Sequence, residues 1–233
     1  MRVSVVTFPG SNCDQDAVWA FGEILGVDVT PVWHKSHDLA NPDLVFIPGG
    51  FSFGDYLRSG AIARFSPIMN EVAQHYRKGG YVMGICNGFQ ILCEMGILPG
   101  CLMKNRDLAF LCQDVYVRCE SSKSPLTYGL STGTVLNIPI AHGMGRYVAD
   151  DDTLRSLEDH QQVVFRYTTA SGELTEEANP NGSLNAIAGI CDESGRALGM
   201  MPHPERHVES ALGSDDGLQV LGGLIEYLEY AAT

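Results

Sequence analysis

Basic residues are scarce in this sequence, in which 15 lysines and arginines stand against 28 acidic residues for a net charge of −13. A surface of this sign repels phosphate backbones, so we expect no nucleic acid partner. No run approaches the roughly 20 apolar residues that a membrane-spanning helix needs, and we expect no membrane association. The N-terminus carries no signal-peptide stretch, because its apolar run breaks at Pro9-Gly10.

Paired cysteine patterns and nucleotide-binding motifs are also missing. The seven cysteines are scattered, without a C-x-x-C pair, which argues against a disulfide framework or a zinc site and favours a reducing cytoplasm. The chain has no Walker A motif, no G-x-G-x-x-G fingerprint and no cluster of metal ligands. We therefore expect this chain to bind no cofactor or metal ion, and to have no place for activating a substrate with ATP.

Short apolar runs alternate with helical patterns in the first half of the chain. Strands are predicted at 3–8, 27–33, 44–47 and 81–85, and helices at 14–25, 66–78 and 87–95. The second half contains strand patterns at 115–119, 135–140, 163–168, 186–190 and 198–200, then a closing helix at 217–230. This order predicts an α/β fold with a doubly wound, mostly parallel sheet, flanking helices and extra strands in the C-terminal half. Since we find no linker or repeat, we expect residues 1–233 to form a single domain.

A lone cysteine, Cys86, lies between the apolar run that ends at Gly84 and the helical pattern that follows. With Gly88 two residues further on, the pattern is the cysteine version of the nucleophile elbow. The backbone of such a turn is crowded, so its neighbours cannot carry bulky side chains. Free N–H groups in the first turn of the helix favour a thiolate. Taken alone, the pattern fits a buried core cysteine equally well.

A histidine between two prolines, His203, is followed two residues later by Glu205. The prolines restrict the backbone and predict a stiff, extended segment. In an extended chain the two side chains face one way, with Cα atoms about 7 Å apart. Glu205 could then accept the imidazole N–H and fix its tautomer, although an isolated H-x-E pattern also fits a surface turn.

A third element, Pro48-Gly49-Gly50, follows the apolar run at 44–47. It reads either as a simple turn or as an oxyanion hole, in which backbone N–H groups approach a reacting carbonyl without an intervening side chain. All three elements follow apolar strands, and ligands gather at the carboxyl ends of parallel strands. Their combination indicates acyl transfer by a cysteine nucleophile, a histidine held by a glutamate, and backbone oxyanion donors.

The set P-G-G, G-I-C-N-G and P-H-P-E resembles the class I (triad) glutamine amidotransferases, which have a flavodoxin-like fold. Longer segments narrow the resemblance to the glutaminase subunits of phosphoribosylformylglycinamidine synthases, which serve purine biosynthesis. These segments are F-P-G-S-N-C-D (8–14), P-G-G-F-S-F-G-D-Y-L-R-S-G-A-I-A (48–63), P-I-A-H-G-M-G-R-Y (139–147) and N-P-N-G-S (179–183). The similarity runs nearly from end to end.

The resemblance implies that Cys86 attacks the side-chain amide of glutamine and forms a thioester. His203 would give a proton to the departing ammonia and later help water attack the thioester, while Glu205 orients His203. The implied oxyanion donors are the backbone N–H groups of Gly50 or Phe51 and of Asn87. The implied substrate contacts are Gly49, Gln90, His142 and Gly143.

The resemblance also implies two partners, a large synthetase and a small bridging protein, as further subunits of a complex. ATP and Mg²⁺ are expected on the synthetase, which would use the ammonia to convert formylglycinamide ribonucleotide to its amidine. The segment 51–58, F-S-F-G-D-Y-L-R, combines three aromatic residues with an arginine. That composition is favoured at interfaces, so we expect the segment near the docking surface.

One position departs from the family pattern. An acidic residue usually follows A-H-G, whereas this chain has Met144. If that carboxylate contacts a partner or the substrate ammonium, the contact is altered here. The triad is intact, so the departure does not indicate inactivity.

Three other functions compete with this interpretation. A cysteine hydrolase of the α/β-hydrolase type places its acid before the histidine, whereas Glu205 follows His203. A non-catalytic scaffold would be expected to have a broken triad. A redox sensor would need a resolving cysteine nearby in sequence, and Cys93 lies about two helical turns from Cys86.

Overall fold

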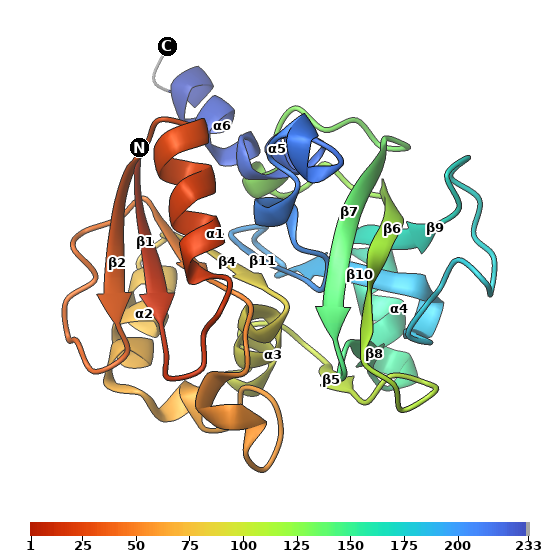
Figure 1. The fold of residues 1–233 in the computed structure, drawn as a ribbon, viewed down its shortest axis with the longest axis horizontal. Helices are drawn as coiled ribbons and strands as arrows, with labels where there is room; N and C mark the ends of the chain where they lie inside the picture. Colours follow the sequence, from red (N-terminus) through yellow and green to blue (C-terminus); the bar gives the residue numbers. More distant parts are fainter. Residues whose placement is uncertain (232–233) are drawn as a thin grey trace.

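A computed structural model describes residues 1–231, in which one nine-stranded sheet and a separate two-stranded sheet are formed (Figure 1). The large sheet has the strand order β2-β1-β3-β4-β11-β10-β9-β6-β7, and β5 pairs with β8. The strands are β1 Arg2–Thr7, β2 Asp28–Trp33, β3 Leu44–Ile47, β4 Tyr81–Ile85, β5 Cys101–Met103, β6 Leu111–Cys119, β7 Val135–His142, β8 Arg146–Val148, β9 Val163–Thr168, β10 Ile187–Cys191 and β11 Ala197–Met200.

The large sheet is parallel from β2 to β11 and antiparallel from β11 to β7. In β3, β4 and β11 nearly every residue is buried, as expected of parallel strands that are covered on both faces. The predicted α/β fold with extra strands in the C-terminal half is thereby confirmed. Because β3, β4 and β11 are neighbours, the segments that leave their carboxyl ends meet at one edge of the sheet.

Helices cover both faces of the parallel half; α1 lies in front of the sheet and α2 behind it (Figure 1). The helices are α1 Asp14–Trp19, α2 Pro67–Arg77, α3 Asn87–Glu94, α4 Asp151–Asp159, α5 Gly217–Leu221 and α6 Gly223–Ala231. None of the helices within residues 1–231 combines the length and the apolar character that crossing a bilayer requires.

Several elements differ from the sequence-based expectation. The helix predicted at 14–25 becomes a π-helix at Ala20–Ile24. The closing helix is interrupted between α5 and α6, where Gly223 lies against the 125–128 turn; a Cβ there would be 2.7 Å from Leu126 O. The short strands β5 and β8 and the helix α4 were not predicted. Helix α4 has an ordinary N-cap, since Asp150 Oδ1 accepts from the Thr153 N–H at 2.7 Å.

The start of α5 is packed against the segment that carries the predicted histidine. The Gly217 N–H donates to His207 O at 2.8 Å. A Cβ at Gly217 would lie 2.0 Å from Pro204 O, so no side chain fits at this position without displacing the 204–207 backbone. The C-terminal part of the chain therefore supports the predicted catalytic segment from behind.

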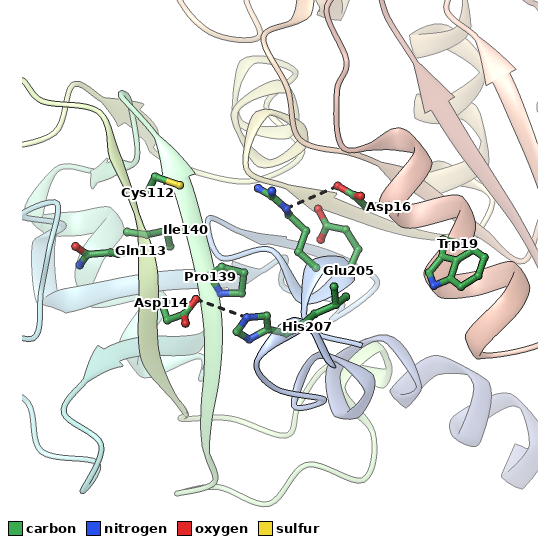
Figure 2. A pocket seen from close by; sticks show the side chains of 11 residues that line it. Asp16, Trp19, Cys112, Gln113, Asp114, Pro139, Ile140, Glu205 and His207 are labelled. Carbon is green, nitrogen blue, oxygen red and sulfur yellow. Dashed lines mark ion pairs between the residues drawn. The ribbon is translucent and has the colours of Figure 1, made fainter. Parts of the chain in front are cut away.

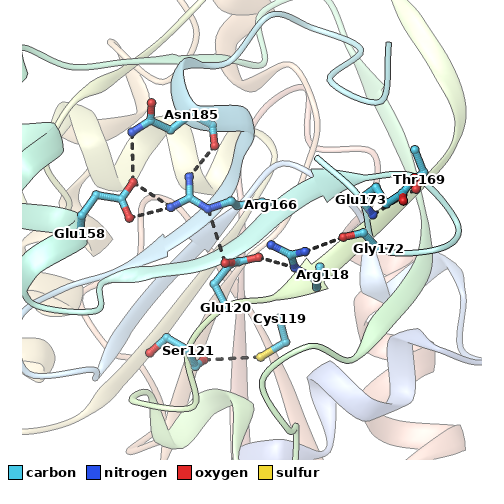
Figure 3. A network of polar contacts seen from close by, with 10 residues as sticks. All are labelled: Arg118, Cys119, Glu120, Ser121, Glu158, Arg166, Thr169, Gly172, Glu173 and Asn185. Atoms are coloured by element: carbon cyan, nitrogen blue, oxygen red, sulfur yellow. Dashed lines mark hydrogen bonds and ion pairs between the residues drawn. The ribbon is translucent and has the colours of Figure 1, made fainter. Parts of the chain in front are cut away.

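A network of ion pairs joins α4 to the antiparallel half of the sheet (Figure 3). Arg166 on β9 binds both carboxylate oxygens of Glu158, at 2.7 and 2.6 Å, and its Nε lies 3.6 Å from Glu120. Glu120 in turn accepts from Arg118 at 2.7 Å. Because every charge in the network has an opposite partner, we interpret it as a structural support for α4.

Candidate active site

Cys86 lies in the sharp turn between β4 and α3, with φ +52° and ψ −104°. A non-glycine residue in this region is strained by about 1–3 kcal/mol, and such strain clusters at functional sites. The side chain is 5% exposed, and its Sγ lies 3.8 Å from Ala141 O. The Cys86 N–H donates to Met200 O at 2.8 Å, which ties the turn to the end of β11.

The two glycines that flank Cys86 are required by close backbone contacts. A Cβ at Gly88 would lie 1.9 Å from Ile47 O, and one at Gly84 would lie 2.6 Å from the Gly88 backbone. Only glycine therefore lets α3 approach β3 and turn this sharply after β4. The predicted elbow geometry is present.

The His203 imidazole and the Glu205 carboxylate are buried and in contact, with Nδ1 2.7 Å from Oε1. The expectation of an extended segment is wrong beyond His203, because Pro204–Arg206 forms a turn of 3₁₀ helix. Pro204 takes the first position of this turn, where the missing N–H would have no partner, and the Arg206 N–H donates to His203 O at 3.2 Å. The contact between the two side chains thus forms across a turn.

Two buried histidines in this region are shifted in opposite directions. Burial alone lowers the pKa of His203, but Glu205 and then Cys86 raise it, and the result is well above the ordinary value. Burial and the nearby His203 lower the pKa of His142 to about 3. His203 is therefore suited to hold a proton that His142 cannot take.

The Pro48-Gly49-Gly50 segment passes directly beside the imidazole. A Cβ at Gly49 would lie 2.4 Å from His203 Cε1. The Phe51 N–H donates to Gly10 O at 2.8 Å, so it is not free to bind an oxyanion in this structure. For the Gly50 N–H we find no acceptor within residues 1–231. Of the two donors expected here, the geometry favours Gly50.

Gln90 lies in α3, and its side chain is buried rather than on the solvent-facing side of the helix. Its Oε1 accepts from Asn87 Nδ2 at 2.8 Å, and its Nε2 donates to Met144 O at 2.6 Å. Asn87 Oδ1 in turn accepts from the Ser52 N–H at 3.2 Å. Since both ends of the Gln90 amide are engaged, its contact with glutamine stays a prediction, and its visible role is to join α3 to the turn after β7.

The turn after β7 is held by Asn105, a residue that the sequence patterns did not single out. Asn105 Oδ1 lies 3.1 Å from His142 Nδ1 and accepts from the Gly145 N–H at 2.9 Å. The Gly143 carbonyl accepts from the Asn105 N–H at 3.0 Å. His142 Nε2 is buried without a partner in the described structure. The arrangement fixes the His142 ring near His203.

A second thiol belongs to the site and was missed by motif analysis. Side-chain donor atoms of Cys13, His203 and Glu205 all lie within 4.8 Å of one another. The F-P-G-S-N-C-D segment contributed to the family resemblance, but nothing in its pattern predicted this contact. Within residues 1–231 this is the one group of three side chains placed to share a metal ion. Because Glu205 Oε1 already pairs with His203 Nδ1, we interpret the group as part of a hydrolytic centre.

Behind the triad a pocket of about 520 Å³ opens between α1 and β7 (Figure 2). Glu205 lies at its wall, and an ion pair between Arg206 Nε and Asp16 Oδ2, 3.7 Å apart, crosses beside it. Asp114 faces His207 on the other side, with Oδ1 3.5 Å from Nε2. The pocket next to Glu205 is thus lined by polar and charged side chains of α1, β6 and the 203–207 segment.

The 51–58 segment lies beyond the oxyanion segment and is strongly exposed. Tyr56 is 69% exposed, and the Phe51 and Phe110 rings stack with centroids 6.2 Å apart. Arg58 is engaged with Glu94, to which it donates two hydrogen bonds at 2.5 and 2.6 Å. Of the residues expected at a docking surface, Tyr56 is therefore free to contact a partner, whereas Arg58 supports the loop.

Comparisons with known proteins agree with this geometry. The profile of the CobB/CobQ-like glutamine amidotransferase domain matches residues 1–215. A relative from Koribacter versatilis is 52% identical over 225 residues, covering 97% of each chain, and is named phosphoribosylformylglycinamidine synthase subunit PurQ. A relative from Trichormus variabilis with the same name is 54% identical over 226 residues, again covering 97% of each chain.

Among solved structures, that of PurLQS from Thermotoga maritima contains a chain that is 43% identical to this one. The two superpose with a TM-score of 0.86 and cover 97% and 98% of their lengths. A crystal structure of another glutamine amidotransferase from Thermotoga maritima has 15% identity and a TM-score of 0.59, with 99% and 97% covered. The second similarity concerns the fold alone.

Proposed function

This chain belongs to the family of CobB/CobQ-like glutamine amidotransferases, and we propose that it is the glutaminase subunit of a phosphoribosylformylglycinamidine synthase. The observation that carries the proposal is the placement of Cys86 at a strained elbow where it interacts with His203, the partner of Glu205. The name shared by the near full-length relatives gives the substrate class and the pathway, purine biosynthesis. We further propose that residues 1–233 act as one amidotransferase domain.

In the first half-reaction, the Cys86 thiolate attacks the side-chain amide carbon of glutamine. The carbonyl electrons move to oxygen, and we propose that the N–H groups of Gly50 and Asn87 stabilise the resulting oxyanion. When the intermediate collapses, the C–N bond breaks and His203 gives its proton to the leaving nitrogen. Ammonia departs and a γ-glutamyl thioester remains on Cys86.

In the second half-reaction, His203 takes a proton from water as the water attacks the thioester carbon. The C–S bond then breaks, glutamate leaves, and Cys86 returns to the thiolate beside a protonated His203. The high pKa of His203 suits both steps, because the ring begins the cycle protonated and can give that proton to the leaving ammonia, and the neutral ring is then a strong base toward water. Glu205 keeps Nδ1 protonated so that Nε2 faces the reacting atoms.

The ammonia is delivered to a partner. We propose that this chain assembles with a large synthetase (PurL) and a small bridging protein (PurS), as the composition of the Thermotoga maritima complex indicates. ATP and Mg²⁺ would bind to the synthetase, which converts formylglycinamide ribonucleotide to its amidine. We also infer a reducing, cytoplasmic location, which the seven unpaired cysteines support.

A glutamine-analogue diazoketone tests the proposal directly. The chain, assembled with its synthetase partners, is treated with the reagent and mapped by peptide mass. We expect a single adduct on Cys86 that excess glutamine prevents, while the exposed Cys101 and Cys112 report any non-specific alkylation. A folded, assembled complex without a glutamine-protected adduct on Cys86 would contradict the amidotransferase function.

A further inference from the structure

We propose that Cys13 is a positioning residue of this glutaminase centre, whose thiol holds the His203 ring in place and whose backbone holds the oxyanion segment. The inference rests on the glutaminase function proposed above. It assigns a role to the F-P-G-S-N-C-D segment, which the catalytic triad leaves unexplained.

The His203 imidazole is packed closely on the side that faces Cys13. Donor atoms of Cys13, His203 and Glu205 lie within 4.8 Å of one another, and all three residues are buried. A Cβ built on Gly49 would lie 2.4 Å from His203 Cε1 and 3.3 Å from Cys13 Sγ. The Nδ1–Cε1 edge of the ring is therefore enclosed by the Glu205 carboxylate, the Gly49 backbone and the Cys13 sulfur. Removing the sulfur would leave one side of this enclosure open.

The backbone around Gly49 is held by the segment that contains Cys13. The N–H groups of Cys13 and Asn12 both point at Gly49 O, at 3.3 and 3.5 Å. Phe51 lies two residues after Gly49, and its N–H donates to Gly10 O at 2.8 Å. The 10–13 segment thus fixes the peptide groups on both sides of Gly50, so that the Gly50 N–H keeps one orientation.

The thiol proton of Cys13 is directed at Asn12. Cys13 Sγ lies 3.3 Å from Asn12 Oδ1, to which it donates, so its lone pairs are left for the imidazole side. Burial raises the pKa of the Cys13 thiol. Cys13 therefore stays protonated beside His203, and of the two thiols that face the ring only Cys86 acts as the nucleophile.

Cys13 is itself anchored through the helix that follows it. Cys13 directly precedes α1, and Asp16 in the first turn of α1 pairs with Arg206, the residue after Glu205. The start of α1 consequently contacts the 203–206 segment at two points, through Cys13 at His203 and through Asp16 at Arg206. A displacement of Cys13 would be transmitted to His203 rather than absorbed by a mobile loop.

The test compares Cys13→Ala and Cys13→Ser with Cys191→Ala, a matched control that removes a fully buried thiol from β10, away from the site. Glutamine hydrolysis is measured in the assembled complex between pH 5.5 and 9, with ammonia-dependent synthesis as the check on assembly. We expect Cys13→Ala to lower kcat about tenfold, with the KM for glutamine within about twofold, since misplacing a catalytic group acts on the chemical step. In the pH profile of kcat for Cys13→Ala, the limb that reports the titration of His203 should move to lower pH, because Cys13 is among the groups that raise the pKa of His203.

Cys13→Ser should recover most of kcat, because its hydroxyl can still donate to Asn12, and Cys191→Ala should leave both kcat and the pH profile unchanged. The proposal is overturned if Cys13→Ala matches Cys191→Ala in kcat and pH profile. It is also overturned if the serine variant loses as much kcat as the alanine variant with an unshifted limb. Should Cys13→Ala fail to fold, Cys13→Val replaces it, because valine fills a similar volume without lone pairs for the imidazole; kcat and a pH profile equal to those of Cys191→Ala would then overturn the proposal. Wild-type hydrolysis and Cys86 labelling test the glutaminase function separately.

Discussion

His203 Nδ1 and Glu205 Oε1 lie 2.7 Å apart, and only Pro204 separates the two residues in the chain. The carboxylate that orients the base is therefore supplied by the same short turn, and neither side chain is more than 1% exposed. Because both side chains come from one short turn, the contact between His203 and Glu205 depends little on long-range packing. The pair depends on packing for its position against Cys86, which comes from another strand.

Glu205→Gln tests the orienting contact with almost no change of volume. The amide has no negative charge and can donate its NH2 group to Nδ1, so the tautomer with Nε2 free to act as a base is no longer enforced. We expect kcat for glutamine hydrolysis to fall at least about 10²-fold, with a smaller change in KM. Steady-state kinetics of the assembled complex measure this, and a near wild-type kcat would refute the assigned role.

Removal of the nucleophile separates the two activities of the complex. Cys86→Ala should abolish glutamine-dependent synthesis, because no thioester can form, and should leave ammonia-dependent synthesis intact. His203→Ala should behave in nearly the same way. Comparing both nitrogen sources in one preparation provides the control, and retained glutamine-dependent turnover in either variant would remove that residue from the mechanism.

Gly49→Ala should displace the catalytic ring. The new Cβ would stand 2.4 Å from His203 Cε1, closer than any real contact, whereas the same change at Gly22 meets only Val29 at 3.7 Å. We expect about a 10²-fold loss of kcat for Gly49→Ala and wild-type activity for Gly22→Ala. Thermal unfolding of both variants shows whether the loss arises at the site, and equal activity of the two variants would contradict the packing argument.

Protonation of His142 should make the fold less stable in acid. Its pKa is about 3 in the folded chain and about 6.5 when unfolded, so between these values the unfolded state binds a proton that the native state does not. This contribution is complete above pH about 6.5 and is lost at about 1.4 kcal/mol per pH unit as the pH falls. His203 acts with the opposite sign, because its raised pKa adds stability below about 6.5 that is lost at higher pH.

The measurement is the free energy of urea unfolding at pH 7.5, 6.0 and 5.0 for the wild type and His142→Gln. The variant keeps an amide N–H for Asn105 but has no group that titrates in this range, so its stability should fall less steeply. Parallel pH dependences for the two proteins would show that His142 is not buried as a neutral ring.

The exposed Tyr56 should contribute to complex formation. Tyr56→Ala is expected to raise the Kd for the synthetase about tenfold, as truncation of an aromatic interface residue commonly does. Leu174→Ala, which removes a 51% exposed apolar side chain from the segment after β9, is the matched control. Calorimetric titration measures both, and undiminished complex formation by a Tyr56→Ala, Arg58→Ala double variant would place the docking surface elsewhere.

Much of the parallel half could be predicted from local patterns. The runs 44–47 and 81–85 coincide with β3 and β4 because their apolar residues are bounded by proline and glycine. The three-residue strands β5 and β8 are too short to show an alternating pattern. The π-helical end of the first helix lies in a segment whose sequence is periodic throughout, so only packing distinguishes it.

The residues of the site likewise include some that local sequence patterns predict and some that they do not. Cys86, His203 and Glu205 carry their own local signals, in flanking glycines and prolines. Cys13 and Asn105 carry none, because their roles arise only when the 10–13 segment meets Gly49 and when Asn105 reaches the turn after β7. The engagement of the Phe51 N–H with Gly10 is likewise a tertiary contact that no motif spacing encodes.

Gly217, at the start of α5, should be a position at which substitutions impair the protein although it lies outside the active site. It is not part of the triad, yet a Cβ at this position would lie 2.0 Å from the carbonyl oxygen of Pro204, the residue between His203 and Glu205. In a library that scores every single substitution for growth without purines, we expect position 217 to tolerate as little as the nucleophile itself. The positions that tolerate no substitution would then include residues that pack against the 203–206 turn as well as those that carry out the chemistry.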